Sequence, residues 1–388
     1  MKKDRDIWYI GLLSFFGGIS QDMFAPVLPI YLTTILGFDK TLVGIAEGIV
    51  TASWNVFRVV AGYLSDRFKR QKPLIFIGYF LSMVSRPLLA LVSGVAPVFG
   101  LRLMDGIGKG VKDPPKDVLI AGTSPEVTRG RSFGISRMLD TLGSVAGPLV
   151  LALLLYLFRA SASVYHIIII VSAVPLLATL TILTRRVHEI PRAAARAQSV
   201  PGSTKPLPTS FFLFMAVVVV FTLGNSSDAF LILRARNLGV TLIEIPIVIA
   251  LFNLIYALLA VPFGSLSDRI GRIPTLAMGW AAYALTYVGF GLAGGAAVVW
   301  PLYVLYGIYY ATSEGVARAF LADMVEFGHR GRAFGIYGMT VGLTTLPASI
   351  LAGYLWDRYG PQTPFFVGAG LAGTAVVLLL LTRRFSER

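Results

Sequence analysis

The chain alternates between long apolar runs and short polar stretches. Each apolar run is roughly 20 residues long or longer, which is the length that an α-helix needs to cross the hydrocarbon core of a bilayer. The runs are continuously apolar, whereas membrane strands would alternate in segments of about ten residues. The pattern therefore predicts twelve membrane-spanning helices, at residues 7–36, 41–66, 73–95, 97–122, 131–158, 163–185, 210–235, 241–267, 274–295, 298–323, 332–356 and 362–382.

The second half of the chain repeats the first. The sequence GYLSDR at 62–67 returns 202 residues later as GSLSDR at 264–269. In the same order, RGRSFGI at 129–135 returns 201 residues later as RGRAFGI at 330–336. Two matches at nearly one offset indicate an internal duplication.

The duplication also relates two aspartates inside apolar runs. A third match, at an offset of 206 residues, pairs Asp22 with Asp228. Asp22 lies roughly 15 residues, at about 1.5 Å each, after the start of its run and therefore near mid-membrane. We expect the two aspartates to face each other across a cavity, with Arg102 or Arg58 as groups that could neutralise Asp22.

Each half carries six predicted helices. Because six is even, the halves have the same orientation in the membrane and are related by an axis along the membrane normal. A stretch rich in Ala, Pro, Ser and Arg separates them and has the composition of a linker without a core. The sequence thus predicts an N-terminal six-helix bundle at 1–186, a cytoplasmic linker at 187–209 and a C-terminal six-helix bundle at 210–388.

Composition agrees with a membrane protein and excludes a soluble enzyme. Of 388 residues, 55% are hydrophobic and only 14% are charged, and the mean hydropathy is +0.73. Of the 34 Lys and Arg residues, 21 lie on one side of the predicted membrane, five on the other and eight inside spans. The positive-inside rule then places both termini in the cytoplasm of an integral plasma (inner) membrane protein. The net charge of +14 is a topology signal, and no nucleic-acid partner is expected.

The sequence does not favour catalysis or a bound cofactor. There is no cysteine, the three histidines are far apart, and no nucleophile lies beside a base, so we expect neither an enzyme nor a metal site. Residues 105–110, DGIGKG, look like a phosphate loop, but Lys109 is followed by Gly110 instead of Ser or Thr. No predicted strand precedes them either, so nucleotide binding and ATP-driven transport lose their support.

Charged residues of the N-terminal half lie on single helix faces. Five charges of the fourth helix occupy an arc of about 100°, and Pro114-Pro115 is expected to kink the helix after them. Equal numbers of cations and anions are typical of a structural ion network, which is the alternative to direct contact with a substrate. The cations are Arg58, Arg102, Lys109, Lys112 and Arg137, and the anions are Asp22, Glu47, Asp105, Asp113 and Asp140.

Acids outnumber bases inside the C-terminal half, where Asp228, Glu314 and Arg318 are the internal charges. A carboxylate that lacks a full set of partners in a low-dielectric site can carry a proton near neutral pH. Asp22, Asp228 and Glu314 are therefore the candidate proton sites. The predicted substrate cavity is lined by Glu47, Trp54, Asn55, Arg58, Asp105, Lys109, Lys112, Asp113, Arg137, Asp140, Asn225, Asn253, Tyr256, Tyr310 and Arg318.

The sequence G-x-L-x-D-R-x-G-R after the second helix of each half resembles the signature of the major facilitator superfamily. The positions are Gly62, Asp66, Arg67 and Arg70 in the first copy and Gly264, Leu266, Asp268, Arg269, Gly271 and Arg272 in the second. The first copy departs from the signature because Lys69 stands where glycine is expected. The resemblance implies an all-α membrane protein of twelve transmembrane helices, arranged as two parallel pseudo-symmetric six-helix bundles. It also implies that this loop helps to lock a cytoplasmic gate.

Two further matches resemble the proton-coupled drug and metabolite antiporters of that superfamily. Arg102, Gly106 and Gly108 resemble a fourth-helix motif whose arginine is implicated in proton coupling, which makes Arg102 a fourth candidate. The sequence GSVAGP at 143–148 resembles the fifth-helix antiporter motif G-x-x-x-G-P, without its closing glycines. Small residues at this spacing also serve any tight helix crossing.

These observations predict a monomeric secondary transporter that works by alternating access in the lipid bilayer. Its partners would be protons and a small-molecule substrate, and we expect proton-coupled efflux of a small organic or amphiphilic compound. The alternative is proton-coupled uptake of a charged metabolite. Transport of a lipid or a metal chelate, and a non-transporting sensor, are further alternatives.

Overall fold

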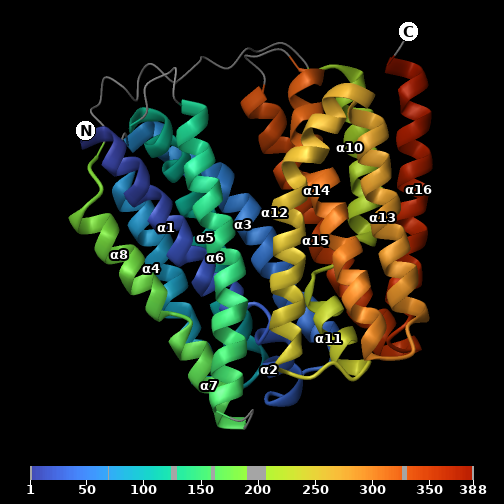
Figure 1. The fold of residues 1–388 in the computed structure, drawn as a ribbon, viewed down its shortest axis with the longest axis horizontal. Helices are drawn as coiled ribbons and strands as arrows, with labels where there is room; N and C mark the ends of the chain where they lie inside the picture. The colour runs from blue at the N-terminus through green and yellow to red at the C-terminus, as the bar shows by residue number, and fades with distance from the viewer. Residues whose placement is uncertain are drawn as a thin grey trace. The chain divides into compact units, whose positions relative to one another are not determined.

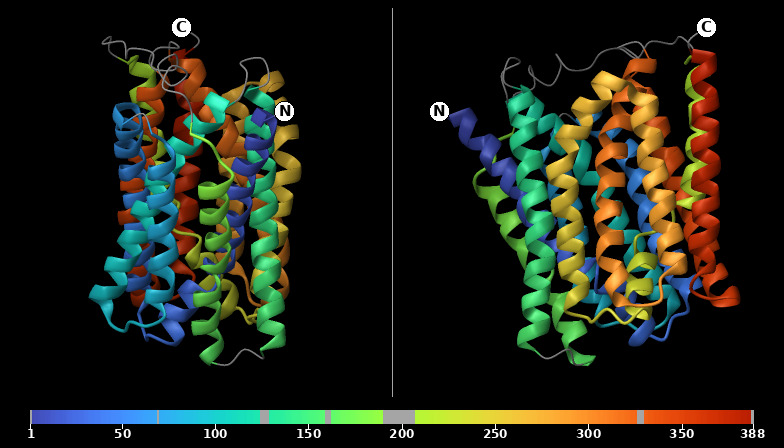
Figure 2. Two further views of the ribbon diagram at one scale, coloured as in Figure 1. Left: turned by 90° about the vertical axis from the view of Figure 1, so that its left-hand side faces the viewer. Right: turned by 45° about the vertical axis from the view of Figure 1, so that its right-hand side comes forward.

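The computed structural model describes residues 2–68, 70–123, 129–158, 162–189, 207–325 and 330–386. Nearly all of these residues are helical, and no strand occurs among them. The chain forms two compact units. Unit 1 comprises Met1–Gly37 and Ile49–Val200, and unit 2 comprises Phe38–Gly48 and Pro201–Arg388. Within each unit the long helices lie side by side with their axes roughly aligned (Figures 1 and 2).

Unit 1 contains the helices of the first half of the sequence repeat. They are α1 (Lys2–Phe24), α2 (Leu28–Thr34), most of α3 (Lys40–Phe68), α4 (Lys72–Leu89), α5 (Val95–Thr123), α6 (Arg129–Leu157), α7 (Ala162–Val171) and α8 (Val174–Arg185). Helix α1 packs against α6 and α8, and α4 packs against α5 and α8. Apolar residues of α1, α4, α5 and α8 form its core, in which Ile10, Leu13 and Ile75 are fully buried.

Unit 2 repeats this packing with the helices of the second half. They are α10 (Thr209–Gly224), α11 (Ala229–Asn237), α12 (Glu244–Ile270), α13 (Arg272–Leu292), the 3₁₀ turn η2 (Ala296–Val298), α14 (Val299–Met324), α15 (Arg330–Tyr359) and α16 (Thr363–Ser386). Helix α10 packs against α15 and α16, and α13 packs against α14 and α16. These are the pairings that the repeat predicts from α1 with α6 and α8, and from α4 with α5 and α8.

Seven helical segments of the described residues are long and apolar enough to cross a membrane by length and composition alone. Helix α5 is also long enough to cross a membrane, at 29 residues, but it carries too many charged side chains to be one of these seven segments. Its charges therefore need partners inside the protein.

Three predicted spans contain a helix break in the structure that the sequence prediction did not include. The spans 7–36, 163–185 and 210–235 divide into α1 and α2, α7 and α8, and α10 and α11. Pro26 and Pro175, which lack a backbone N–H, lie at the first two breaks. The third break contains no proline; it begins at Asn225 and continues through two serines, whose side chains compete for backbone hydrogen bonds. In contrast, Pro114 and Pro115 do not interrupt α5.

Glycines of α5 let it approach α3 and α4 closely. A Cβ on Gly106 would collide with Ser53 of α3, and a Cβ on Gly108 would lie 2.6 Å from the carbonyl oxygen of Gly78 in α4. The spacing that looks like a phosphate loop is therefore a helix-packing pattern.

The glycines of the 143–148 stretch serve the crossing of α1 and α6. A Cβ on Gly143 would collide with the backbone of Phe15, and a Cβ on Gly147 would lie 2.7 Å from the carbonyl oxygen of Ile19. Helix packing by itself requires these small residues, so they add no separate support for antiport.

Helix α3 belongs to both units, because its first turns, up to Gly48, pack against α15 in unit 2. The Asp357 carboxylate accepts hydrogen bonds from the backbone N–H groups of Lys40 at 3.1 Å and Thr41 at 2.8 Å, and from the Thr41 hydroxyl at 2.7 Å. It therefore caps the N-terminus of α3. A Cβ on Gly353 would lie 2.6 Å from the Cα of Thr41, so this contact also depends on glycine.

Candidate functional site

A buried ion cluster in unit 1 places three cations around one carboxylate. Oxygens of Asp105 lie 3.0 Å from Lys109 Nζ, 3.5 Å from Arg102 and 3.9 Å from Arg86. The Lys109 side chain is 14% exposed, and the other three are at most 4% exposed. Buried charges are tolerated when they are paired in this way, so the cluster is a structural network of α4 and α5.

Arg86 is the member of this cluster that the helical-face pattern did not predict. Its guanidinium donates to the Ser20 hydroxyl and, at 3.0 Å, to Gln21 of α1, and it lies 5.1 Å from the ring centroid of Phe24. One signal could have found it. Arg86 is the single charged residue in the predicted span 73–95, and a lone arginine at membrane depth needs an anionic partner.

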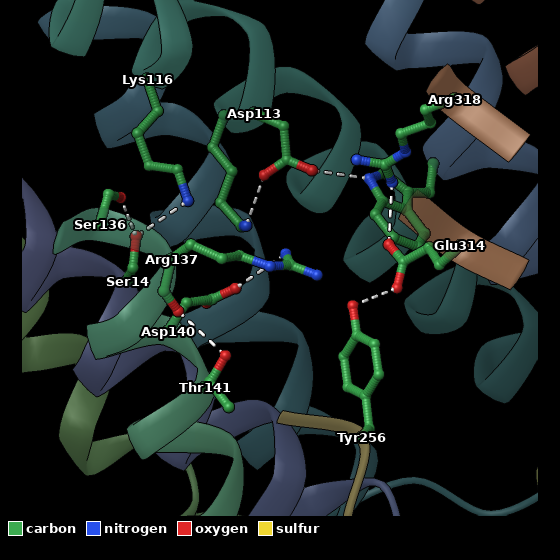
Figure 3. Close-up of polar contacts among 12 residues, drawn as sticks. Ser14, Asp113, Lys116, Ser136, Arg137, Asp140, Thr141, Tyr256, Glu314 and Arg318 are labelled. Atoms are coloured by element: carbon green, nitrogen blue, oxygen red, sulfur yellow. Dashed lines mark hydrogen bonds and ion pairs between the residues drawn. The ribbon is translucent and has the colours of Figure 1, made fainter. Parts of the chain in front are cut away.

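A second group of charges follows on α5. Lys112 and Asp113 pair at 2.8 Å, and Trp54 Nε1 of α3 donates to Asp113 at 2.9 Å. Beyond the two prolines, Lys116 Nζ donates to the Ser14 hydroxyl of α1 at 3.1 Å (Figure 3). The predicted charged face of α5 thus exists, but it divides into a buried cluster and this partly buried group.

The other predicted residues of unit 1 make weaker contacts. Arg137 and Asp140 form a pair 3.4 Å apart on α6, with side chains 55% and 36% exposed (Figure 3). The Asn55 amide donates to a backbone oxygen of its own helix at 2.9 Å. Arg58 acts electrostatically on Asp113.

Asp22 lies in the last turn of α1 and is partly buried. The charged groups that act on its carboxylate are the like charge of Asp140 and then the cations Lys109 and Arg86, rather than the Arg102 or Arg58 that the sequence suggested. Asp22 is therefore part of the electrostatic network of unit 1.

In unit 2 the chain unwinds at residues 225–228, between α10 and α11. The freed backbone groups have partners in neighbouring helices. The Tyr283 hydroxyl donates to the Gly224 carbonyl oxygen at 2.8 Å, and the Ser227 N–H donates to the Ser349 hydroxyl at 3.1 Å. Because lipid offers no hydrogen bonds, an unwound segment at membrane depth requires such partners.

Asp228 is the last residue of this unwound segment, and it is exposed. Its two oxygens accept hydrogen bonds from the hydroxyls of Tyr306 at 2.5 Å and Tyr310 at 3.3 Å. Among the described residues no cation pairs with it, and the charged group that acts on it is Glu47, in the α3 segment of unit 2. The two repeat-related aspartates thus differ: Asp22 is helical and lies among charges of both signs, whereas Asp228 is outside a helix and accepts hydrogen bonds from hydroxyls.

Four side chains lie on one face of α14 because they recur every four residues. They are Tyr306, Tyr310, Glu314 and Arg318. Glu314 pairs with Arg318 at 2.9 Å and accepts a hydrogen bond from the Tyr256 hydroxyl of α12 at 2.7 Å (Figure 3). The side chains of Glu314 and Arg318 are 31% and 53% exposed. The structure therefore brings five predicted residues to one region of unit 2, namely Asp228, Tyr256, Tyr310, Glu314 and Arg318.

Two further predicted residues of unit 2 are asparagines. The Asn225 amide donates to the Tyr309 hydroxyl at 3.0 Å, and Asn253 is partly buried on α12. Tyr306 was not predicted, although it lies one helical turn before Tyr310. No group of three or more His, Asp or Glu side chains in the described part of the chain could hold a metal ion.

The second copy of the predicted gate motif is organised by Arg272. Its guanidinium pairs with Asp268 at 2.6 Å and with Asp323 of α14 at 3.1 Å, while Arg269 is exposed. Gly271, between α12 and α13, has φ +98°, a conformation that glycine adopts without strain. Asp323 is an acidic partner that the motif alone does not identify.

The first copy is described in part. The side chains of Asp66 and Arg67 lie outside the described residues, and Arg70 is exposed. A Cβ on Gly62 or on Gly264 would meet nothing within 4 Å. Packing inside each unit therefore does not explain why glycine occupies these two positions.

The chain is similar to known proteins over nearly its whole length. Residues 10–233 and 209–388 match the sequence model of the Major Facilitator Superfamily. An uncharacterized MFS-type transporter of Methanocaldococcus jannaschii is 33% identical over 382 residues, which cover 97% of this chain and 94% of that protein. The tetracenomycin C resistance and export protein of Streptomyces glaucescens is 27% identical over 210 residues, 53% of this chain and 39% of that protein.

Among solved structures, a mutant of the nucleoside transporter NupG is similar with a TM-score of 0.83. The match covers 97% of this chain and 99% of that chain at 15% sequence identity. At this identity the likeness concerns the fold, and it confirms the predicted arrangement of twelve helices in two six-helix bundles.

Proposed function

The chain belongs to the Major Facilitator Superfamily, and from this premise we propose that it exports a small organic or amphiphilic compound in exchange for protons. Membership makes it an integral membrane transporter and not an enzyme. The direction is supported by the likeness to a protein named for resistance and export. The bundles would expose one site alternately to the two sides of the membrane.

The observation that carries proton coupling is the environment of Asp228. Its carboxylate is exposed, lies at a helix break and is hydrogen-bonded by tyrosine hydroxyls. A hydroxyl can donate to the ionised form and accept from the protonated form, so both states of the carboxyl group keep partners. Asp105, by contrast, is fixed among three cations.

The alternative, uptake of a charged metabolite, has less support from the geometry where that metabolite is an anion. The exposed Arg137 and Arg318 are paired with Asp140 and Glu314. Arg86 and Arg102 are at most 4% exposed and Lys109 is 14% exposed. All three already pair with Asp105.

We also propose a monomer of the plasma (inner) membrane with both termini in the cytoplasm. This orientation rests on the excess of basic residues in the segments that connect the helices on one side. The bilayer and protons would be its partners besides the exported compound.

Reconstitution tests the proposal. A thermal-shift screen of the purified protein against metabolites and drugs identifies a substrate, because a ligand of the folded state raises the melting temperature. Its accumulation is then measured in proteoliposomes under an imposed pH gradient. We expect Asp228→Asn to lose the pH-driven component and to keep exchange down a substrate gradient.

Glu314→Gln is the matched comparison, since Glu314 already pairs with Arg318; we expect it to keep pH-driven transport. If Asp22→Asn, Asp228→Asn and Glu314→Gln each kept full pH-driven transport, coupling through these carboxylates would be wrong. If no gradient produced flux of any screened ligand, the result would favour a non-transporting sensor over a transporter.

A further inference from the structure

An aromatic cluster surrounds the exposed Asp228 in unit 2. The ring centroid of Tyr310 lies 5.3 Å from that of Tyr306, 5.1 Å from that of Phe252 and 5.9 Å from that of Tyr256. The Tyr310 ring plane stands at 69°, 81° and 70° to the planes of these three rings, and the planes of Phe252 and Tyr306 stand at 33° to each other. Rings at steep angles around one point can offer their faces to a single charged group, as in an aromatic cage.

These rings do not simply fill the core. Tyr306 is 1% exposed, but Tyr310, Tyr256 and Phe252 are each partly exposed. Asp228 beside them is exposed as well, and a carboxylate at membrane depth cannot face lipid chains. The surface that carries these groups is therefore an aqueous one, open to a ligand.

The charge of this surface is negative. Asp228 is held by hydroxyls, and Glu47 acts on it as a like charge. Arg318 is committed to Glu314 at 2.9 Å, and the Tyr256 hydroxyl donates to the other oxygen of the same carboxylate. The surface thus combines a carboxylate without a cationic partner and several electron-rich ring faces.

We propose that this cluster binds an organic cation, such as a protonated or quaternary amine or a phosphonium. The cation would lie beside the Asp228 carboxylate and over the faces of Tyr310 and its neighbours. A tyrosine that donates its hydroxyl to a carboxylate keeps its ring face available, so both interactions can act together. This names the substrate class of the exporter and rests on the function proposed above; proton and substrate would then compete for Asp228.

Equilibrium binding of tetraphenylphosphonium to the purified full-length protein tests this. Tetraphenylborate has the same shape and the opposite charge, and it therefore controls for non-specific apolar binding. We expect the phosphonium to bind and the borate to bind at least about tenfold more weakly, a factor that corresponds to about 1.4 kcal/mol. Asp228→Asn should weaken phosphonium binding about fivefold, as losing one partner of a solvent-exposed charge pair does.

Variants at Tyr310 separate the ring from the hydroxyl. Tyr310→Leu, which removes the ring face, should weaken binding about five- to thirtyfold, whereas Tyr310→Phe should keep most of it. Tyr303→Phe is the matched control, because Tyr303 is on the same helix, is 4% exposed and packs against Phe290. We expect no change in that variant.

Asp228→Glu preserves the charge and should retain binding, which separates loss of charge from loss of folding; the melting temperature of every variant is measured alongside. Equal binding of phosphonium and borate, or unchanged phosphonium binding in Asp228→Asn, would overturn the proposal. If Asp228→Asn did not fold, equal affinities of Tyr310→Leu and Tyr310→Phe would overturn it instead.

The binding test needs no transport, so the two proposals can fail separately. If the library yields a neutral or anionic substrate whose pH-driven flux depends on Asp228, the exporter stands and the cation site is wrong. If the phosphonium binds through Asp228 but no flux follows, the cation site stands and the exporter is wrong.

Discussion

Two arginine–aspartate contacts in unit 1 differ in burial. Arg86 is 3% exposed and belongs to the buried cluster of Asp105, whereas the Arg137 side chain is 55% exposed and pairs with Asp140 on the surface of α6. Burial decides the energy of such contacts, since water screens the second pair and not the first.

Arg86→Gln should therefore be strongly destabilising. It removes the buried hydrogen bonds to Ser20 and Gln21 and one of the three cations around Asp105, and leaving buried polar groups without a partner costs about 1–3 kcal/mol of unfolding free energy. Arg137→Gln is the control and should cost no more than about 1 kcal/mol. Thermal unfolding of both variants in one detergent, followed by intrinsic fluorescence, checks the difference, and equal melting temperatures would contradict it.

At the scale of elements, helix ends and helix breaks position the chemistry. The break between α10 and α11 places Asp228 outside a helix, where Tyr306 and Tyr310 reach its oxygens. A similar role of a helix end occurs at Lys40–Thr41, where Asp357 supplies the cap of α3 from another helix.

Asp357→Ala should loosen the first turn of α3. The change removes acceptors for two backbone N–H groups and one hydroxyl, and the loss of a cap costs about 0.5–2 kcal/mol. Hydrogen exchange of the amides at residues 40–44 should become faster. Asp357→Asn, which keeps an acceptor oxygen but not the charge, should give a smaller effect, and unchanged exchange in Asp357→Ala would show that the cap is unimportant.

At the scale of the whole molecule, duplication explains why one packing plan occurs twice. Both units use the same helix pairings, yet their chemistry has diverged. The buried cluster of unit 1 has three cations around one carboxylate, whereas unit 2 exposes a carboxylate among tyrosines. Pseudo-symmetry of the backbone therefore does not imply equal roles for Asp22 and Asp228.

The orientation in the membrane is a prediction at this same scale. Because the chain has no cysteine, single cysteines report on accessibility without background. Lys3→Cys and Ser386→Cys should react with a membrane-impermeant maleimide only from the cytoplasmic side of oriented vesicles. Gln362→Cys, in the segment between α15 and α16, is the control and should react only from the opposite side; the reverse pattern would invert the topology.

The fold class, the duplication and the helix faces that carry charge could all be predicted from the sequence. Each depends on local properties, namely apolar run length, periodicity and repeated letters. The same reasoning identified Asp228, Glu314, Tyr256 and Tyr310, because polar groups inside apolar runs stand out. It did not find Arg86, although a lone arginine in an apolar span was a usable signal.

Tertiary structure decided which charges meet and where helices break. Asp105 pairs with Arg102 and Lys109 of its own helix, but it also meets Arg86 because α4 packs against α5. Asp228 meets Tyr306 and Tyr310 instead, because α14 brings them to the break between α10 and α11. The first turns of α3 likewise join unit 2 because they pack against α15. Run length and periodicity describe one helix at a time, whereas pairing energies depend on distances between helices, and those exist only once the chain has packed.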